Sequence, residues 1–374
     1  MVEIIEVKTK KQVKEFAKFP LKLYKNSEYY VPSFYSDEVN ILNPKKNFLL
    51  EDSDCKCFLA YKDGKLAGRV AGIIQHTSNK LQNEKSIRFS RFEVINDSEV
   101  AKKLFESVET FGKEKGMTLC HGPWGFNDQD REGLLVYGFD KRSTYATNFN
   151  YDYYEQLVKE NGYEEECEWF EYKFHIPTQT DARFLKIAQR VKDTSELREI
   201  ADDYKISKLI KLYGEKIFKT VNECYMTLDG YVPVEGKTMQ NVINQFAMIV
   251  NPKFLSVIVD KKDDVVGFGV ALADVCGALQ KSKGKLLPFG FIRLLKAIKK
   301  PTGLELALIA VTPEYQKRGV NAMVLSKIMT NIINEGIQNV ESNPELSTNT
   351  AVQSQWNSIE KDLIKRRKAF KKSI

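Results

Sequence analysis

The pattern of apolar and polar positions repeats along the chain. Residues 57–72, CFLAYKDGKLAGRVAG, read as two strands joined by a polar turn, with Gly68 inside the second strand. Residues 254–271, FLSVIVDKKDDVVGFGVA, follow the same plan, with Gly267 at the equivalent place. The two hairpins predict that one structural unit occurs twice.

Similar elements flank each hairpin. Upstream, the pattern predicts a strand and then a helix, at 4–7 and 11–24 in the first copy and at 185–191 and 195–218 in the second. Downstream, it predicts a strand and a long amphipathic helix that ends at a glycine, at 87–95 and 98–116, and again at 304–311 and 319–336. Each half therefore has the order β–α–β–β–β–α–β.

This order predicts an α/β protein of two similar domains. The stretch 174–183, FHIPTQTDAR, has the proline and polar residues of a linker, so we expect domains at 1–177 and 178–374. A length of 374 residues suits two domains. The alternative is one large mixed domain in which the similarity arises by chance.

Composition and charge limit the classes of function. The net charge of +7, from 57 basic and 50 acidic residues, permits an anionic ligand without requiring nucleic acid. No apolar run is long enough for a membrane helix and the N-terminus has no secretory signal pattern, so we expect a cytoplasmic protein. Six cysteines without a CxxC pair and only three histidines predict no metal site.

The stretch 310–322, AVTPEYQKRGVNA, carries the clearest candidate chemistry. A strand ends at Val311, and Gln316 to Gly319 lead into a helix. The free amides at a helix N-terminus bind phosphate; Lys317 and Arg318 add positive charge, and Gly319 leaves room for a ligand to approach the backbone. The alternative is a solvated basic turn.

This turn, with the strand before it and the element order of both halves, resembles the acyl-CoA-binding motif of the GNAT (Gcn5-related N-acetyltransferase) superfamily. The resemblance implies two GNAT-like domains, each a mixed, mostly antiparallel sheet flanked by helices, with acetyl-CoA as acyl donor. It also implies that the strand parts from its neighbour after Val311 to admit the thioester. The implied cofactor-binding residues are Val311, Gln316, Lys317, Arg318, Gly319, Val320, Asn321, where the family has Gly or Ala, Ala322 and Asn349.

The resemblance also implies direct acyl transfer to an amine. Glu305, six residues before Val311, stands where related histone acetyltransferases have their general base; the alternative is a strand glutamate that faces solvent. The family often has a tyrosine acid seven residues after an asparagine, but here Asn349 is followed by Trp356, which cannot donate a proton to the thiolate. Another group then supplies the proton, the thiolate leaves unassisted, or the domain does not catalyse.

The first half lacks this motif. In VINDSEVAKK, 94–103, Asp97 and Glu99 would cap the helix and repel a diphosphate, so we expect this copy to bind no CoA and instead to shape the acceptor site or support the other half. In its loop 120–133, His121 and Trp124 are candidates for contact with substrate or with the other domain; the alternative is packing in the core.

Two basic segments distinguish the second half. For 281–300, KSKGKLLPFGFIRLLKAIKK, three interpretations remain: a lid over the acceptor pocket, an amphipathic surface helix, or a contact with anionic lipid or another anionic partner. The tail 364–374, IKRRKAFKKSI, predicts a last strand with basic residues on its open face.

We therefore expect an acyl-CoA-dependent N-acyltransferase, most simply an acetyltransferase, acting on a small-molecule or peptide amine. The first alternative is a tandem GNAT transferase that uses aminoacyl-tRNA or a long-chain acyl donor. The second is a CoA-binding or regulatory protein without catalysis.

Overall fold

The structure, a computed structural model, describes residues 1–128, 130–226, 231–357 and 359–374. Within these residues the strands form one 14-stranded sheet, in the order β1-β2-β3-β4-β5-β14-β7-β12-β11-β10-β9-β8, with β13 beside β7 and β6 beside β14. The strands are β1 (Val2–Glu6), β2 (Ser53–Lys62), β3 (Lys65–Gln75), β4 (Ser86–Val94), β5 (Leu119–Gly122), β6 (Leu134–Tyr137), β7 (Glu164–Phe174), β8 (Arg198–Glu199), β9 (Leu255–Val259), β10 (Val265–Ala273), β11 (Gly303–Val311), β12 (Asn339–Ser342), β13 (Glu345–Leu346) and β14 (Lys361–Ser373).

The two halves of the sheet are built alike. From each outer edge, four strands pair antiparallel and the fifth joins in parallel, as β4 with β5 and as β11 with β12. The predicted α/β class and internal repeat are therefore confirmed.

The in-strand glycines of the two hairpins have the same task. A Cβ on Gly68 would lie 2.7 Å from the Leu104 side chain of α4 (Ser98–Glu114), and a Cβ on Gly267 would lie 2.6 Å from the Val320 side chain of α11 (Val320–Asn334). Each glycine thus lets the long helix of its half pack closely on the sheet. The opposite face of the second half is covered by α7 (Ile206–Tyr225), on which α8 (Gly236–Ile249) packs.

The helices have the following bounds: α1 (Lys10–Leu23), α2 (Tyr35–Asn40), α3 (His76–Gln82), α4 (Ser98–Glu114), α5 (Tyr154–Glu160), α6 (Ala182–Thr194), α7 (Ile206–Tyr225), α8 (Gly236–Ile249), α9 (Cys276–Ser282), α10 (Gly290–Lys299), α11 (Val320–Asn334) and α12 (Thr350–Gln355), with short 3-10 turns η1 (Phe48–Asp52), η2 (Pro252–Phe254) and η3 (Pro313–Tyr315).

The prediction for 185–191 is wrong. This segment lies in α6 rather than in a strand, because its apolar residues recur at helical spacing and Asp181 caps the helix by accepting a hydrogen bond from the Arg183 amide. The edge strand of the second half is the short β8, and its helix runs later than predicted, as α7.

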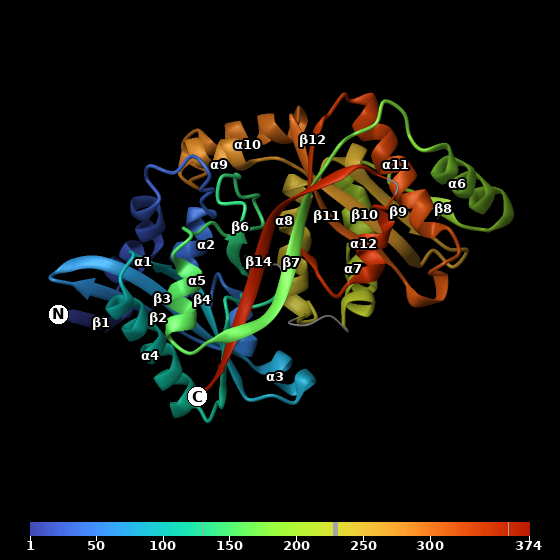
Figure 1. Cartoon of the computed structure of the whole chain (residues 1–374). Helices are drawn as coiled ribbons and strands as arrows, with labels where there is room; N and C mark the ends of the chain where they lie inside the picture. Colours follow the sequence, from blue (N-terminus) through green and yellow to red (C-terminus); the bar gives the residue numbers. More distant parts are fainter. Residues whose placement is uncertain (129, 227–230, 358) are drawn as a thin grey trace.

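The last strand joins the two halves of the molecule. In Figure 1, β7 and β14 run side by side through the middle, and β14 pairs with β5 as well as with β7. A C-terminal strand thus completes the N-terminal half of the sheet, across the predicted boundary at 177–178. The tail is a strand as predicted, but its basic residues do not all face an open surface: Lys365 and Arg367 are fully buried and pair with the buried Glu171.

Candidate functional site

The two parallel strands of the second half separate partway along their length. β11 pairs with β12 from Gly303 to Leu306, and the amide of Asn343 then donates to the Leu306 carbonyl at 3.1 Å. In the described part of the chain the rest of β11 pairs with β10 alone. The separation therefore begins at Leu306, not after Val311, because the chain turns away from β11 at Asn343-Pro344.

A cavity of about 290 Å³ occupies this separation. One side is formed by the free edge of β11 at 306–309, by α11 and by the segment 343–356. The segment from α7 through α8 adds apolar and aromatic residues, Tyr225, Tyr231, Val242, Phe246 and Ile249, and the first half of the chain adds Tyr145 and three acidic residues, Asp128, Asp130 and Glu132. A slot along a strand edge thus continues into a chamber that is mostly apolar and aromatic but also carries acidic side chains from the first half.

Glu345 places a carboxyl group on the wall of this cavity. It lies on β13, its side chain accepts a hydrogen bond from Trp356 Nε1 at 2.8 Å, and its Oε2 is buried without a hydrogen-bond partner among the described residues. Burial raises the pKa of Glu345 to about 7, against the opposing effect of the Trp356 hydrogen bond. At neutral pH this carboxyl group can therefore both hold and release a proton.

Asn349 and Trp356 both line the cavity, and the short helix α12 fixes them there. The Asn349 side chain caps α12 by accepting a hydrogen bond from the Val352 amide at 3.2 Å. The Trp356 ring packs against Phe174 of β7, with ring centroids 5.1 Å apart. Trp356, at the position where the family often has a tyrosine acid, therefore orients the carboxyl group of Glu345.

The basic turn follows the C-terminal end of β11, beyond the part of the strand that is separated from β12. Gln316 donates to the Val311 carbonyl at 3.1 Å, and Gly319, at φ +84°, is the residue before α11. Val311 pairs with Gly267, while Lys317 and Arg318 are exposed. The residues of the turn, predicted to bind the cofactor, do not line the cavity. Asn349, also predicted to bind the cofactor, does line the cavity.

The N-termini of α11 and α4 differ in their capping. Among the described residues no side chain caps α11, so the amides of its first turn, Val320 to Ala322, are available. The Asn321 Oδ1 is buried there without a hydrogen-bond partner in the described part of the chain. In α4 the predicted cap is present: Asp97 accepts from the Val100 amide at 3.1 Å and pairs with Lys62.

Gly319 serves packing as well as the turn. A Cβ at this position would lie 2.6 Å from Val191 and 2.9 Å from Ile187, both on α6. The space that the glycine leaves is thus filled by α6 rather than left open, and α6 borders the turn.

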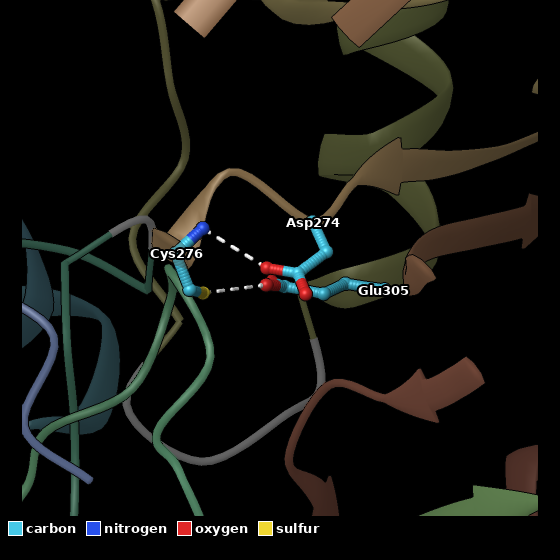
Figure 2. A group of neighbouring side chains, drawn as sticks. All are labelled: Asp274, Cys276 and Glu305. Carbon is cyan, nitrogen blue, oxygen red and sulfur yellow. Dashed lines mark hydrogen bonds between the residues drawn. The ribbon is translucent and has the colours of Figure 1, made fainter. Parts of the chain in front are cut away.

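Glu305 lies behind the cavity wall, in the group shown in Figure 2. It is 3% exposed, accepts a hydrogen bond from the Tyr145 amide at 3.0 Å, and has Cys276 Sγ at 3.5 Å and Asp274 beside it. Asp274 pairs with Arg142. Burial raises the pKa of Glu305 to about 7, while the Tyr145 amide opposes this shift. Glu305 thus does not face solvent; it reaches the cavity through Tyr145, which lines it.

His121 and Trp124 are buried, at 4% and 2% exposure, and both contact Glu166, His121 through Nδ1 and Trp124 through Nε1. Neither lines the cavity; Trp124 packs against Trp169, which does. The sequence alone does not single out Glu345 or the aromatic chamber, because both depend on contacts between distant segments. The one local signal is the Asn343-Pro344 turn directly after a strand.

No family model matches the chain. It is 25% identical over 303 residues to a bacterial ceramide synthase of Caulobacter vibrioides, covering 80% of this chain and 77% of that one. It is 22% identical over 376 residues to protein YghO of Escherichia coli, covering 98% and 94%.

Solved structures define the fold. A tandem GNAT protein from the clavulanic acid biosynthesis pathway matches with a TM-score of 0.57 and 7% identity, over 100% of this chain and 98% of that one. A Gcn5-related N-acetyltransferase of Sphaerobacter thermophilus matches with a TM-score of 0.51 and 10% identity, over 99% and 95%. The protein therefore has the GNAT fold, with two GNAT-like domains in tandem.

Proposed function

We propose that this protein is an acyl-CoA-dependent N-acyltransferase whose second half binds the donor. The observation that carries the proposal is the cavity at the separation of β11 and β12, on the same strand that leads to the uncapped N-terminus of α11. The strand edge offers backbone groups to an extended pantetheine arm, and the helix amides with Lys317 and Arg318 suit the pyrophosphate.

The cavity favours an acyl chain longer than acetyl. An acetyl group has one methyl to bury, whereas this cavity continues to an aromatic and aliphatic wall formed by α7, α8 and adjacent segments. The relative in Caulobacter supports the same choice, since ceramide is a long-chain amine that carries an acyl group on nitrogen. Acetyl-CoA is the simpler donor to test beside a long-chain acyl-CoA. No feature of the cavity specifically favours aminoacyl-tRNA as the donor.

The chemistry needs two proton transfers. The amine nitrogen attacks the thioester carbonyl, the C–N bond forms, the C–S bond breaks, and the amine proton must leave while the thiolate gains one. We assign the acid to Glu345, since it is in the cavity and its pKa of about 7 leaves it partly protonated at neutral pH. Glu305 is the candidate base. It would take the amine proton through a water molecule, because Tyr145 lies between its carboxyl group and the cavity.

Titration calorimetry with CoA, acetyl-CoA and palmitoyl-CoA tests the donor. We expect the wild type to bind all three and to bind palmitoyl-CoA most tightly. The double change Lys317→Glu/Arg318→Glu alters exposed side chains alone and should weaken binding at least tenfold.

The matched control lies on α4. Lys102→Glu/Lys103→Glu reverses two exposed charges near a helix N-terminus that Asp97 already caps, and it should leave CoA affinity unchanged. Absence of CoA binding by the wild type would refute the proposal. Binding without acyl transfer to any amine of a broad panel would favour a regulatory CoA-binding protein.

A further inference from the structure

Four large apolar side chains are exposed within residues 287–292, around the start of α10. Their exposed fractions are 81% for Leu287, 62% for Phe289, 44% for Phe291 and 62% for Ile292. Elsewhere in the described residues, exposed large apolar side chains are scattered, apart from a pair on α6. A contiguous exposed apolar group of this kind marks a surface that binds something. We call these four residues the α10 patch.

Exposed basic residues flank the α10 patch on both sides along the chain. Between Asp274 and Glu305 the sequence has no acidic residue. Seven exposed basic side chains lie in this segment: Lys281, Lys283, Lys285, Arg293, Lys296, Lys299 and Lys300. None of the seven forms an ion pair with a described residue, although Lys285 lies over the Tyr35 ring.

The segment is anchored to the body of the protein, so the α10 patch has a fixed place. Leu294 and Ile298 on the inner face of α10 are buried against α9, in a core cluster that Tyr145 and Ile249 of the cavity wall also contact. The Tyr35 amide donates to the Gly284 carbonyl at 2.9 Å. These contacts favour a fixed surface over a hinged lid. In Figure 1, α9 and α10 lie along the upper edge of the molecule.

We propose that the α10 patch docks on an anionic lipid surface, with its four apolar side chains among the lipid headgroups and the flanking lysines and Arg293 on lipid phosphates. An exposed apolar group flanked by unpaired cations matches such a surface in both chemistry and charge. A second copy of the chain matches poorly, because a symmetric contact would bring the same seven cations together. No helix in the described part of the chain is long and apolar enough to span a bilayer, so contact would be peripheral.

This docking would bring membrane lipid close to the cavity wall, because α10 belongs to the same core cluster as Tyr145 and Ile249, which line the cavity. The inference stands apart from the proposed acyl transfer: it concerns vesicle binding, which needs neither CoA nor turnover, so either proposal can fail without the other.

Vesicle flotation of the full-length protein tests the α10 patch. At low salt we expect the protein to float with vesicles of equal parts phosphatidylglycerol and phosphatidylcholine, and not with phosphatidylcholine alone. Phe289→Ser/Ile292→Ser should lower the partition coefficient at least tenfold through lost apolar burial, and Lys296→Glu/Lys299→Glu roughly tenfold through lost attraction. High salt should weaken the binding of the wild type.

The control is Leu81→Ser/Leu212→Ser, which removes two exposed apolar side chains elsewhere and should bind vesicles as the wild type does. Circular dichroism and thermal unfolding confirm that each variant is folded. Equal flotation of the wild type and Phe289→Ser/Ile292→Ser, or no flotation of the wild type, would overturn the proposal. So would a dimer in sedimentation analysis that Phe289→Ser/Ile292→Ser abolishes.

Discussion

Trp356 of the segment after α12 donates its indole N–H to the carboxyl group of Glu345 at 2.8 Å, inside the cavity where β11 and β12 separate. A tryptophan in place of the expected tyrosine therefore does not leave the cavity without a titratable group. It holds a buried carboxyl group in position, and burial raises the pKa of that group to about 7.

Glu345→Gln should lower kcat for acyl transfer about 100-fold, the usual contribution of a general acid. Glutamine keeps the shape and the hydrogen bond from Trp356 but cannot give a proton to the thiolate. Thiol release from palmitoyl-CoA, with a panel of amines, measures the rate. In the wild type the rate should fall above pH 7 as Glu345 loses its proton, and the variant should lack this alkaline limb. Glu314→Gln, on the exposed turn η3, should keep the rate and pH profile of the wild type.

Trp356→Phe should shift the alkaline limb to higher pH. The indole hydrogen bond stabilises the charged form of Glu345, so its loss raises the pKa of the carboxyl group further. The phenyl ring can still pack against Phe174, which separates the loss of the hydrogen bond from the loss of packing. An unchanged pH profile with a lower rate would show that Trp356 acts through packing alone.

Local patterns predict the repeated units well and the contacts between them poorly. Gly68 and Gly267 mark equivalent hairpins, and the turn before α11 is visible in the sequence because hairpins and helix starts depend on neighbouring residues. The place of β14 in the sheet cannot be read from the sequence, because Glu171, the partner of Arg367, lies 196 residues away along the chain. A strand rich in lysine and arginine looks solvent-facing until its buried acid is known. Glu345 is hidden for the same reason, as its role depends on Trp356 and on burial.

Val242→Trp should make the protein discriminate against long acyl chains. Val242 lies on the apolar wall of the cavity, on α8, so a larger side chain there reduces the space for the end of the chain. We expect palmitoyl-CoA affinity to fall at least tenfold and acetyl-CoA affinity to change less than twofold, as measured by calorimetry. Val242→Ala, which enlarges the cavity, is the matched control. An equal fall for both donors would indicate that the acyl chain does not occupy this part of the cavity.

Glu305→Gln should stabilise the protein more at pH 8 than at pH 5. The folded pKa of Glu305, about 7, is raised by burial above its ordinary value of 4.5, so the folded state binds more protons than the unfolded state between these values. The stability of the wild type therefore falls as the pH rises through this window, by about 3 kcal/mol for this group. Glutamine removes the dependence and can still accept from the Tyr145 amide.

Urea denaturation at the two pH values measures the difference, with the exposed Glu84→Gln as control. A stability difference between Glu305→Gln and the wild type that is the same at pH 5 and pH 8 would contradict the burial of a titrating carboxyl group. Loss of acyl transfer in a variant that is more stable at pH 8 would support the role of base.

Arg367→Met should destabilise the whole molecule by about 3 kcal/mol, because the fully buried Glu171 keeps Lys365 but loses one of its two cationic partners. Burial alone would raise the pKa of Glu171, but Arg367 and Lys365 hold it below its ordinary value, so the contribution of this group is present at neutral pH and is lost as the pH falls through that lowered pKa. The double variant Glu171→Gln/Arg367→Met should recover part of the loss, because Lys365 keeps Glu341 at 3.0 Å.

Lys368→Met, on the same strand with a half-exposed partner, should cost less than about 1 kcal/mol. If Arg367→Met unfolded no more easily than Lys368→Met, the buried pair could not be what holds β14 between the two halves.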